Sequence, residues 1–246
     1  MARASGAIRR AAAQAALLAL SLTAPAALAG VVQVNNTRLD IARGAKSVAI
    51  TVSNPSDDQV VVQMNVVAWA QSSGKDVYVD SEDFVVAPPI ATIAAGGEQI
   101  VRLVMRRRSD PTIERAYRLY ISEVPPPPKP GFQGLQVALR IGVPVFVAPS
   151  SGKATPKITW RAERSADRIR IGAQNNGNAH VKFTALEARA GDGQPVVISP
   201  TQPAYILPGA AFFWEASVEH GLVPPRIHLK ASTDAGEITT DLAVEQ

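Results

Sequence analysis

The sequence predicts an all-β protein with two immunoglobulin-like β-sandwich domains. Short segments in which every second residue is apolar recur along the chain, and turns rich in Gly, Pro, Asn and Asp separate them. No long segment of the two predicted domains has the apolar period of an amphipathic helix. The composition agrees with this, because 46% of the residues are hydrophobic but only 5% are aromatic, which is typical of a β-rich core of modest side chains.

Residues 1–29 are predicted to be a secretory signal peptide. Arginines in the first ten residues precede an apolar run at 11–22, and Ala27-Leu28-Ala29 supplies small residues at the cleavage spacing. We therefore expect export and cleavage after about Ala29. The apolar run is short and Pro25 interrupts its end, which argues against a membrane anchor.

The remaining chain is nearly neutral. Three of the 25 Lys and Arg residues lie in the predicted signal peptide, so 22 remain against 21 Asp and Glu residues. The arginine run at 106–108 has no aromatic stacking residues beside it, so we interpret it as a solvated strand end and predict no nucleic-acid partner. The sequence contains no cysteine, so each domain must be held together by its apolar core.

The first predicted domain spans residues 30–148. In segment 47–53 apolar residues alternate with polar or small ones, and a turn containing Pro55 follows. Segment 60–69 is almost continuously apolar, which is typical of a strand covered on both faces. Further strands are predicted at 30–35, at two places within 84–105, at 117–124 and at 135–143. About seven short strands separated by turns are typical of an immunoglobulin-like sandwich.

The strand predicted at 135–143 is the one around which we expect the chain to be organised. Its alternating apolar residues are Leu135, Val137, Leu139, Ile141 and Val143. All five therefore lie on one face of the strand. The proline-rich segment 125–134 comes before it, so the strand is entered from a loop. It could be an ordinary core strand, but a long apolar edge strand also invites pairing with another chain. We favour the hypothesis that this face is lent to a partner.

A second β domain is predicted at residues 153–246. Small residues and proline at 149–153 form the best linker in the chain. Beyond it the alternating pattern resumes, with an Asn-rich turn at 175–178. Strands are predicted at 157–163, 168–173, 179–190, 204–207, 211–218 and 226–233.

No catalytic or metal-binding motif is found. His180, His220 and His228 are scattered without metal-ligand spacing, and there is no phosphate-binding loop, dinucleotide fingerprint or serine nucleophile elbow. Neighbouring carboxylates such as Glu82 and Asp83 lie in predicted polar turns. We therefore expect a binding or assembly protein, not an enzyme, with no cofactor, no metal and no small-molecule substrate.

Four motifs of the first domain, in this order and spacing, resemble the periplasmic pilus chaperones of the chaperone–usher pathways, which are PapD-like proteins. They are NTR at 36–38, PPIATIAAGGEQIVRL at 88–103, ERAYRLYISEVPP at 114–126 and LQVALRIGVPVFVAP at 135–149. The second domain resembles the family more weakly, through QNNGNAHVKF at 174–183 and ILPGA at 206–210.

The resemblance implies a function in the periplasm. Two immunoglobulin-like domains would meet at an angle, and the last strand of the first domain would complete a pilus or fimbrial subunit that lacks its own final strand. An outer-membrane usher would then exchange this strand for that of the next subunit. The alternating pattern fits this mode of binding, and the residues expected to be donated are Leu135, Val137, Leu139 and Ile141.

The resemblance also implies an anchor for the subunit's terminal carboxylate. Arg38 matches the family's arginine, and a guanidinium group suits a carboxylate. The family's second cation, a lysine, is replaced by Pro144, and Arg118 or Arg140 could supply the missing charge or could be solvated strand residues. Glu114 matches the acidic residue of the interdomain contact.

Some positions depart from the family pattern. The arginine that precedes the closing proline in the family is Ala148 here, and the sequence VPVFV stands directly before it at 143–147. These departures resemble the divergent archaic branch of the chaperones. The alternative hypothesis is an exported structural or adhesion protein with two sandwiches of the same kind.

Overall fold

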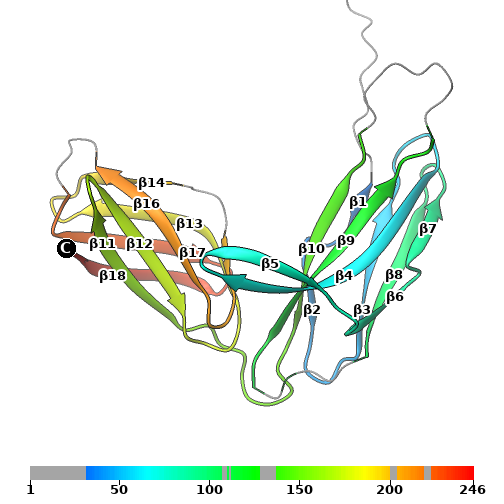
Figure 1. Cartoon of the computed structure of the whole chain (residues 1–246), viewed down its shortest axis with the longest axis horizontal. Helices are drawn as coiled ribbons and strands as arrows, with labels where there is room; N and C mark the ends of the chain where they lie inside the picture. Colours follow the sequence, from blue (N-terminus) through cyan, green and yellow to red (C-terminus); the bar gives the residue numbers. More distant parts are fainter. Residues whose placement is uncertain (1–31, 107–109, 111, 128–136, 200–203, 219–222) are drawn as a thin grey trace, which may run out of the picture.

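The computed structural model describes residues 32–106, 110, 112–127, 137–199, 204–218 and 223–246. The regular structure in these ranges consists of β-strands, which confirms the predicted all-β class. The strands form two domains that meet at an angle, with the first domain on the right in Figure 1 and the second on the left. The predicted signal peptide lies outside the described residues.

The first domain is a sandwich of two sheets. The four-stranded sheet has the order β1 (Gln33–Val34), β3 (Ser47–Ser53), β8 (Glu98–Met105) and β6 (Phe84–Ala87). The other sheet has the order β2 (Leu39–Ile41), β10 (Arg140–Val147), β9 (Arg115–Val124), β4 (Val60–Ser72) and β5 (Lys75–Asp80), and β7 (Ile90–Ile93) also pairs with β4.

Alternating residues of both sheets fill the core of the first domain. Val143 and Val145 of β10 lie in this core with Leu119 of β9. Strand β4 was predicted to be covered on both faces. The structure shows two buried faces near Val66 and Val67, where the strand approaches the second domain, whereas its earlier polar residues are exposed.

The hairpin of β4 and β5 has a tight two-residue turn. Ser73 and Gly74 both have positive φ angles, 51° and 74°, and Ser72 pairs with Lys75 on either side of them. Two positive φ angles in succession are the signature of the turn that matches the natural twist of a hairpin. The turn therefore continues the sheet as a ribbon, and Figure 1 shows this ribbon reaching toward the second domain.

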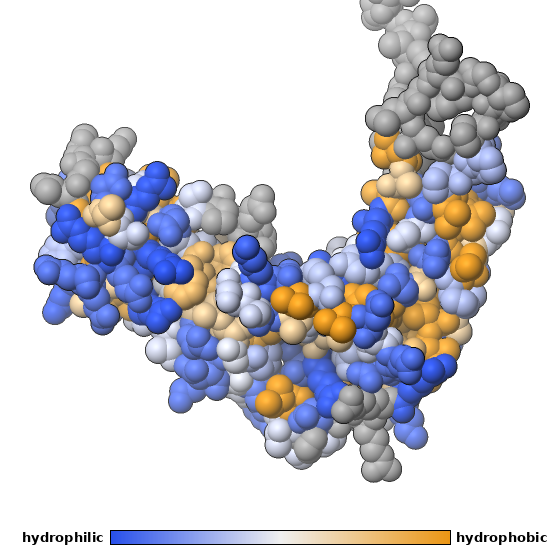
Figure 2. Space-filling model, viewed as in Figure 1, coloured by the Kyte–Doolittle hydropathy of each residue, from blue (hydrophilic) through white to orange (hydrophobic). Residues whose placement is uncertain are grey.

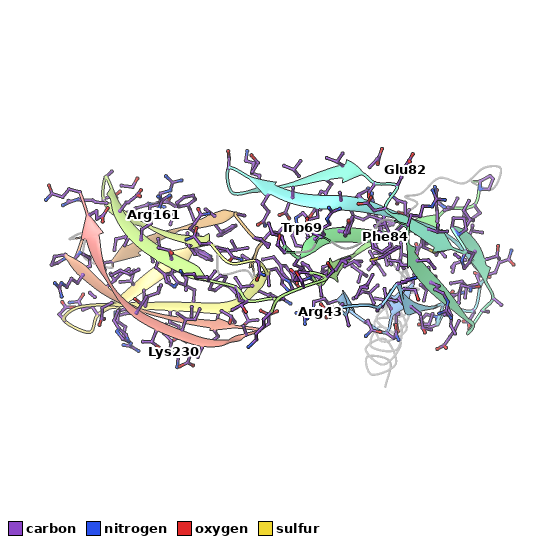
Figure 3. The ribbon with its side chains drawn as sticks, turned by 90° about the horizontal axis from the view of Figure 1, so that it is seen from below. Arg43, Trp69, Glu82, Phe84, Arg161 and Lys230 are labelled. Atoms are coloured by element: carbon purple, nitrogen blue, oxygen red, sulfur yellow. The ribbon has the colours of Figure 1, made fainter. Side chains whose placement is uncertain are left out.

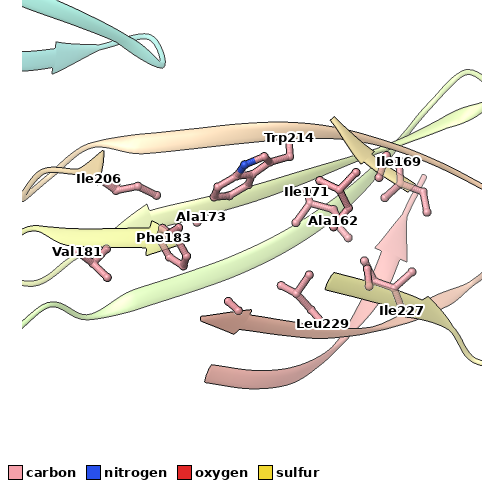
Figure 4. Close-up of a cluster of buried hydrophobic side chains, with 14 of the residues drawn as sticks. Ala162, Ile169, Ile171, Ala173, Val181, Phe183, Ile206, Trp214, Ile227 and Leu229 are labelled. Atoms are coloured by element: carbon pink, nitrogen blue, oxygen red, sulfur yellow. The ribbon is translucent and has the colours of Figure 1, made fainter. Parts of the chain in front are cut away.

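The second domain contains eight strands in one hydrogen-bonded sheet whose layers face each other. The order is β14 (Pro195–Ser199), β16 (Ala211–Val218), β12 (Arg168–Asn175), β11 (Ile158–Ser165), β18 (Gly236–Glu245), β17 (Arg226–Thr233), β13 (Val181–Ala190) and β15 (Ala204–Ile206). A further pairing of β13 with β14 joins the layers. Trp214, Phe183 and Leu229 are among the side chains between the layers in Figure 4.

The two domains share an apolar contact. Trp69 of β4 and Phe146 of β10 belong to the buried cluster of the second domain, although both come from the first. Figure 3 shows Trp69 near the middle of the molecule, where the domains meet. The side chain of Gln71 adds two hydrogen bonds of 2.9 Å, one to the carbonyl of Tyr205 and one from the N–H of Leu207. This contact holds the first domain's β10 beside the second domain.

Candidate functional site

The backbone of β10 is covered unevenly. Strand β9 pairs with it from Arg140 to Val147, but β2 pairs with its other side only from Val145 to Val147. Among the described residues, segment 140–144 therefore pairs on one side only. Pro144 lacks an N–H group, and proline is tolerated in a strand at such an edge. The predicted strand is thus an edge strand over its first half.

The apolar side chains of this strand pass gradually from solvent into the core. Val137 is 58% exposed, Leu139 and Ile141 are half-buried and pack on the core of the first domain, and Val143 is buried. The regular strand begins only at Arg140, later than predicted, and Leu135 lies outside the described residues. Of the residues expected to be donated, Val137 thus exposes most of its side chain, while Leu139 and Ile141 already have partial cover.

Glu123, which the sequence analysis did not single out, fixes the entry to the strand. Its backbone N–H donates to the carbonyl of Leu139 at 2.9 Å, and its carboxylate accepts the N–H of Leu139 at 3.1 Å. The same carboxylate accepts the N–H of Val32 at 3.3 Å. The start of the edge strand is therefore tied to the beginning of the first domain.

Arg38 lies at the boundary of the two domains. Its Nε donates to Asp40 Oδ2 at 2.9 Å, and its Nη1 donates to Asp234 Oδ2 at 2.7 Å, where Asp234 belongs to the turn between β17 and β18 of the second domain. The side chain is 37% exposed. Partial burial opposes the charged form, but the carboxylates of Asp40 and Asp234 outweigh this and raise the pKa of Arg38.

Glu114 contacts the second domain through His180. Its Oε1 lies 2.6 Å from His180 Nδ1 and accepts the His180 backbone N–H at 2.9 Å. His180 Nε2 lies 3.7 Å from Asp234 Oδ2, and the imidazole stacks on Phe146 with ring centroids 3.5 Å apart. A chain of charges thus runs from Glu114 through His180 and Asp234 to Arg38. From the sequence, His180 was assessed only as a metal ligand.

The charges in this chain stabilise one another. Burial works against a charged His180, but its bonds with Asp234 and Glu114 raise the pKa of the imidazole. Burial would raise the pKa of Asp234, yet His180, the backbone N–H of Lys182 and Arg38 lower it to about 2. Asp234 is therefore ionised at neutral pH, and His180 keeps its proton to a higher pH than a free histidine does.

Arg118 and Arg140 are placed differently on the same face of the sheet. Arg118 is paired in register with Pro144, and its guanidinium carbon lies 4.6 Å from the ring centre of Trp69. The guanidinium of Arg140 lies 3.7 Å from the ring centre of Tyr120. Neither arginine forms an ion pair with a described residue, and Arg118 Nε is buried without a hydrogen-bond partner there.

Tyr205 of β15 lies near Arg38 and Arg118, two of the three candidate cations. Burial raises the pKa of its hydroxyl, while the charges of Arg38 and Arg118 act in the opposite direction. Its ring also contacts Trp69 edge-on at a centroid distance of 5.5 Å. Tyr205 is therefore within electrostatic range of both Arg38 and Arg118, and two cations with a hydroxyl suit an anionic group.

Neither a metal-binding cluster nor a membrane-spanning helix occurs among the described residues. Among them, no three His, Asp or Glu side chains gather as a metal site requires. In the same part of the chain no helix is long and apolar enough to cross a membrane. The open edge of β10 and the charged region beside it are thus the features that call for a ligand.

Comparison with known proteins agrees with this geometry. The structure matches a chain of the complex of the chaperone CsuC with the tip adhesion subunit CsuE from archaic Csu pili of Acinetobacter baumannii, with a TM-score of 0.65 and 17% identity, covering 88% of this chain and 100% of that chain. It matches the YadV chaperone with a TM-score of 0.63 and 20% identity, covering 87% and 99%. A comparison with curated protein sequences gives no match.

A third structure in this group holds a pilin. It is the complex of the Salmonella enterica SafA pilin with the SafB chaperone, matched with a TM-score of 0.60 and 20% identity over 89% of this chain and 99% of that chain. These likenesses confirm the fold of two immunoglobulin-like domains. The family model of the PapD N-terminal domain matches residues 31–153, half of the chain. The chain therefore belongs to the family of pili and flagellar-assembly chaperones.

Proposed function

We propose that this protein is a periplasmic chaperone that binds pilus or fimbrial subunits by pairing the open edge of β10 with an extended segment of the subunit. The open edge at 140–144 is the observation that carries the proposal, because a strand paired on one side can hydrogen-bond an extended segment of another chain. Two similar structures are complexes of a chaperone with a subunit or pilin, which supports this assignment.

The exposure of the apolar side chains falls along the strand from Val137 to Val143, and this supports the same mode of binding. A subunit that adds a strand beside segment 140–144 would cover Val137 and complete the cover of Leu139 and Ile141, whose faces are apolar and partly exposed. Leu135 continues this alternation and is proposed as a further donated residue. Backbone bonds then supply affinity that depends little on sequence, and the side chains set the register.

We further propose that Arg38 and Arg118 hold the terminal carboxylate of the subunit. Arg118 is favoured over Arg140 because it lies in register with Pro144, the position where the family's second cation is missing, and because its Nε lacks a described partner. Glu114 is proposed as the interdomain contact, through His180.

Export with removal of residues 1–29 and delivery of the subunit to an outer-membrane usher complete the proposal. Export rests on the charged, apolar and small-residue segments at the start of the sequence. Delivery to an usher rests on the family to which the chain belongs.

Co-expression with the pilus subunit encoded beside this protein tests the proposal. We expect a stable one-to-one complex recovered from the periplasm, in which the subunit is protected from proteolysis only while the chaperone is present. Assembly of this chain into fibres by itself, without a subunit, would contradict the proposal and favour a structural or adhesion protein.

A further inference from the structure

One carboxylate oxygen lies between an arginine and a histidine from different domains. Asp234 Oδ2 is 2.7 Å from Arg38 Nη1 in the first domain and 3.7 Å from His180 Nε2 in the second. The other oxygen of Asp234 accepts the backbone N–H of Lys182 at 2.9 Å. Arg38 thus already has a carboxylate partner at the guanidinium nitrogen that an incoming carboxylate would also seek.

His180 is held in the orientation that this sharing requires. Glu114 binds both its Nδ1 and its backbone N–H, and Phe146 covers the face of the ring. The imidazole is 9% exposed, so it cannot turn toward solvent without breaking these contacts. With Nδ1 held by one carboxylate and Nε2 directed at another, a protonated imidazole satisfies both.

The other polar groups near His180 do not replace it as a partner of Asp234. Lys182 directs its ammonium group toward the Tyr205 ring, at 5.4 Å from the ring centre, and the Tyr205 ring itself lies 5.7 Å from the imidazole. Asp40 pairs with Arg38. The charged groups around the imidazole are thus Glu114 on one side and Asp234, with Arg38 behind it, on the other.

Building on the proposed function, we propose that Asp234 and His180 are positioning residues of the carboxylate site. Asp234 holds the Arg38 guanidinium while no subunit is bound, and His180 keeps Asp234 paired when the subunit's terminal carboxylate takes Arg38. Without this exchange of partners, a partly buried Asp234 would be left with only one backbone N–H, which disfavours release of Arg38.

The exchange depends on the proton of His180. Contacts with two carboxylates raise the pKa of the imidazole, so the charged form persists to a higher pH than in a free histidine. As pH rises through this pKa, His180 loses its charge, and Arg38 is then the charged partner that remains for Asp234. The contribution of the subunit carboxylate to affinity should therefore be fully present below the pKa of His180, as long as both carboxylates stay ionised, and decline as His180 deprotonates.

The first test needs no subunit. NMR titration of the His180 ring in the full chain measures its pKa in the wild type and in Arg38→Ala. If both cations share Asp234, removal of one strengthens the pairing of the other, and the pKa of His180 should rise by about 0.5 to 1 unit. Asp40→Asn is the matched control, because Asp40 also pairs with Arg38 but does not contact His180. An unchanged His180 pKa in Arg38→Ala would overturn the proposal.

The second test measures the carboxylate directly. The probes are a nine-residue peptide of alternating Val and Thr with a free C-terminal carboxylate and the same peptide with a C-terminal amide. We expect the acid to bind the wild type about ten times more tightly than the amide at pH 6, with a smaller ratio at pH 8.5. His180→Gln should give a low ratio at both pH values, and His180→Arg should keep the ratio high at both.

The outcomes separate this inference from the proposed function. If the acid is preferred and Arg38→Ala abolishes the preference, but His180→Gln keeps the wild-type pH profile, the positioning role is wrong and the chaperone function stands. If neither peptide binds the wild type, strand addition itself is contradicted, and the NMR titration still decides whether Arg38 and His180 share Asp234.

Discussion

Truncation of Val137 probes the donated face with little disturbance of the free protein. The Val137 side chain is 58% exposed, so the variant Val137→Ala should change the unfolding free energy by less than about 0.5 kcal/mol. The same exposed surface is what a bound subunit would cover. Loss of affinity without loss of stability is therefore the expected signature.

The size of the effect follows from the exposed fraction. Val→Ala removes two methyl-sized groups, and full burial of each is worth about 0.8 kcal/mol. Because 58% of the side chain remains to be buried by the subunit, the variant should lose about 0.9 kcal/mol of binding free energy, or about fivefold in Kd.

A competition assay can resolve a change of this size. Tagged wild-type protein and an untagged variant are expressed together with a limiting amount of subunit, and the share of subunit on each is measured. Val197→Ala on β14 is the matched control, because Val197 is 61% exposed and lies in the second domain, away from β10. Equal losses for both variants, or none for Val137→Ala, would refute the assignment of the donated face.

Three further changes address other parts of the site. Leu139→Glu should abolish subunit recovery and also lower the unfolding free energy by about 1–3 kcal/mol, because Leu139 packs partly on the core; urea unfolding measures the second effect, and full retention of stability would place Leu139 outside the core. Arg38→Ala should weaken subunit binding by about tenfold or more, with Arg38→Lys recovering only part of it, and near-native affinity of Arg38→Ala would shift the anchor to Arg118 or Arg140. The carboxyl of Asp234 has its pKa lowered to about 2 in the folded protein, so its contribution to stability should be present above about pH 4 and disappear as pH falls toward 2; a stability difference between wild type and Asp234→Asn that does not shrink over this range would contradict the pairing.

Alternation of apolar residues predicted most of the strands, because burial on one face of a sheet imposes a period of two. It predicted β3 and β9 closely but placed the start of the last strand of the first domain at Leu135, whereas the regular strand begins at Arg140. The pattern of side chains continues upstream of Arg140, but an alternating sequence specifies only which face is apolar. Whether a neighbouring strand pairs with it is decided by the rest of the fold.

Strands β2, β5, β14 and β18 were not predicted, and residues 84–105 hold three strands where two were expected. Strand β18 alternates Ile238, Thr240, Leu242 and Val244, a signal that could have been found, although its apolar residues are only half-buried. Strand β5 is exposed along its whole length. Its pairing with β4 depends on the tight turn at Ser73 and Gly74, not on an apolar face, and the polar residues of that turn indicate only the end of a strand.

Of the charged residues of the site, only those in the first domain could be predicted from the sequence. Arg38 and Glu114 came from motifs of that domain, but Asp234, His180 and Tyr205 come from the second domain, where the resemblance is weaker. The contact of Arg38 with Asp234 spans 196 positions, and no local pattern in one sequence reports a contact at that separation. The pairing of Arg118 with Pro144 likewise required the register of β9 against β10.

On the proposed function, the division of the site between the domains gives the second domain a role in binding that the edge of β10 could not fill alone. Backbone pairing along 140–144 belongs to the first domain and is largely independent of sequence, so by itself it would accept many extended segments. Recognition of a chain end requires a carboxylate site, and that region takes Asp234, His180 and Tyr205 from the second domain. The burial of Trp69 and Phe146 in the second domain's core cluster fixes these groups relative to Arg38. On the proposed function, the apolar contact between the domains would set the position of the anchor along the edge, and through it the register in which a subunit strand binds.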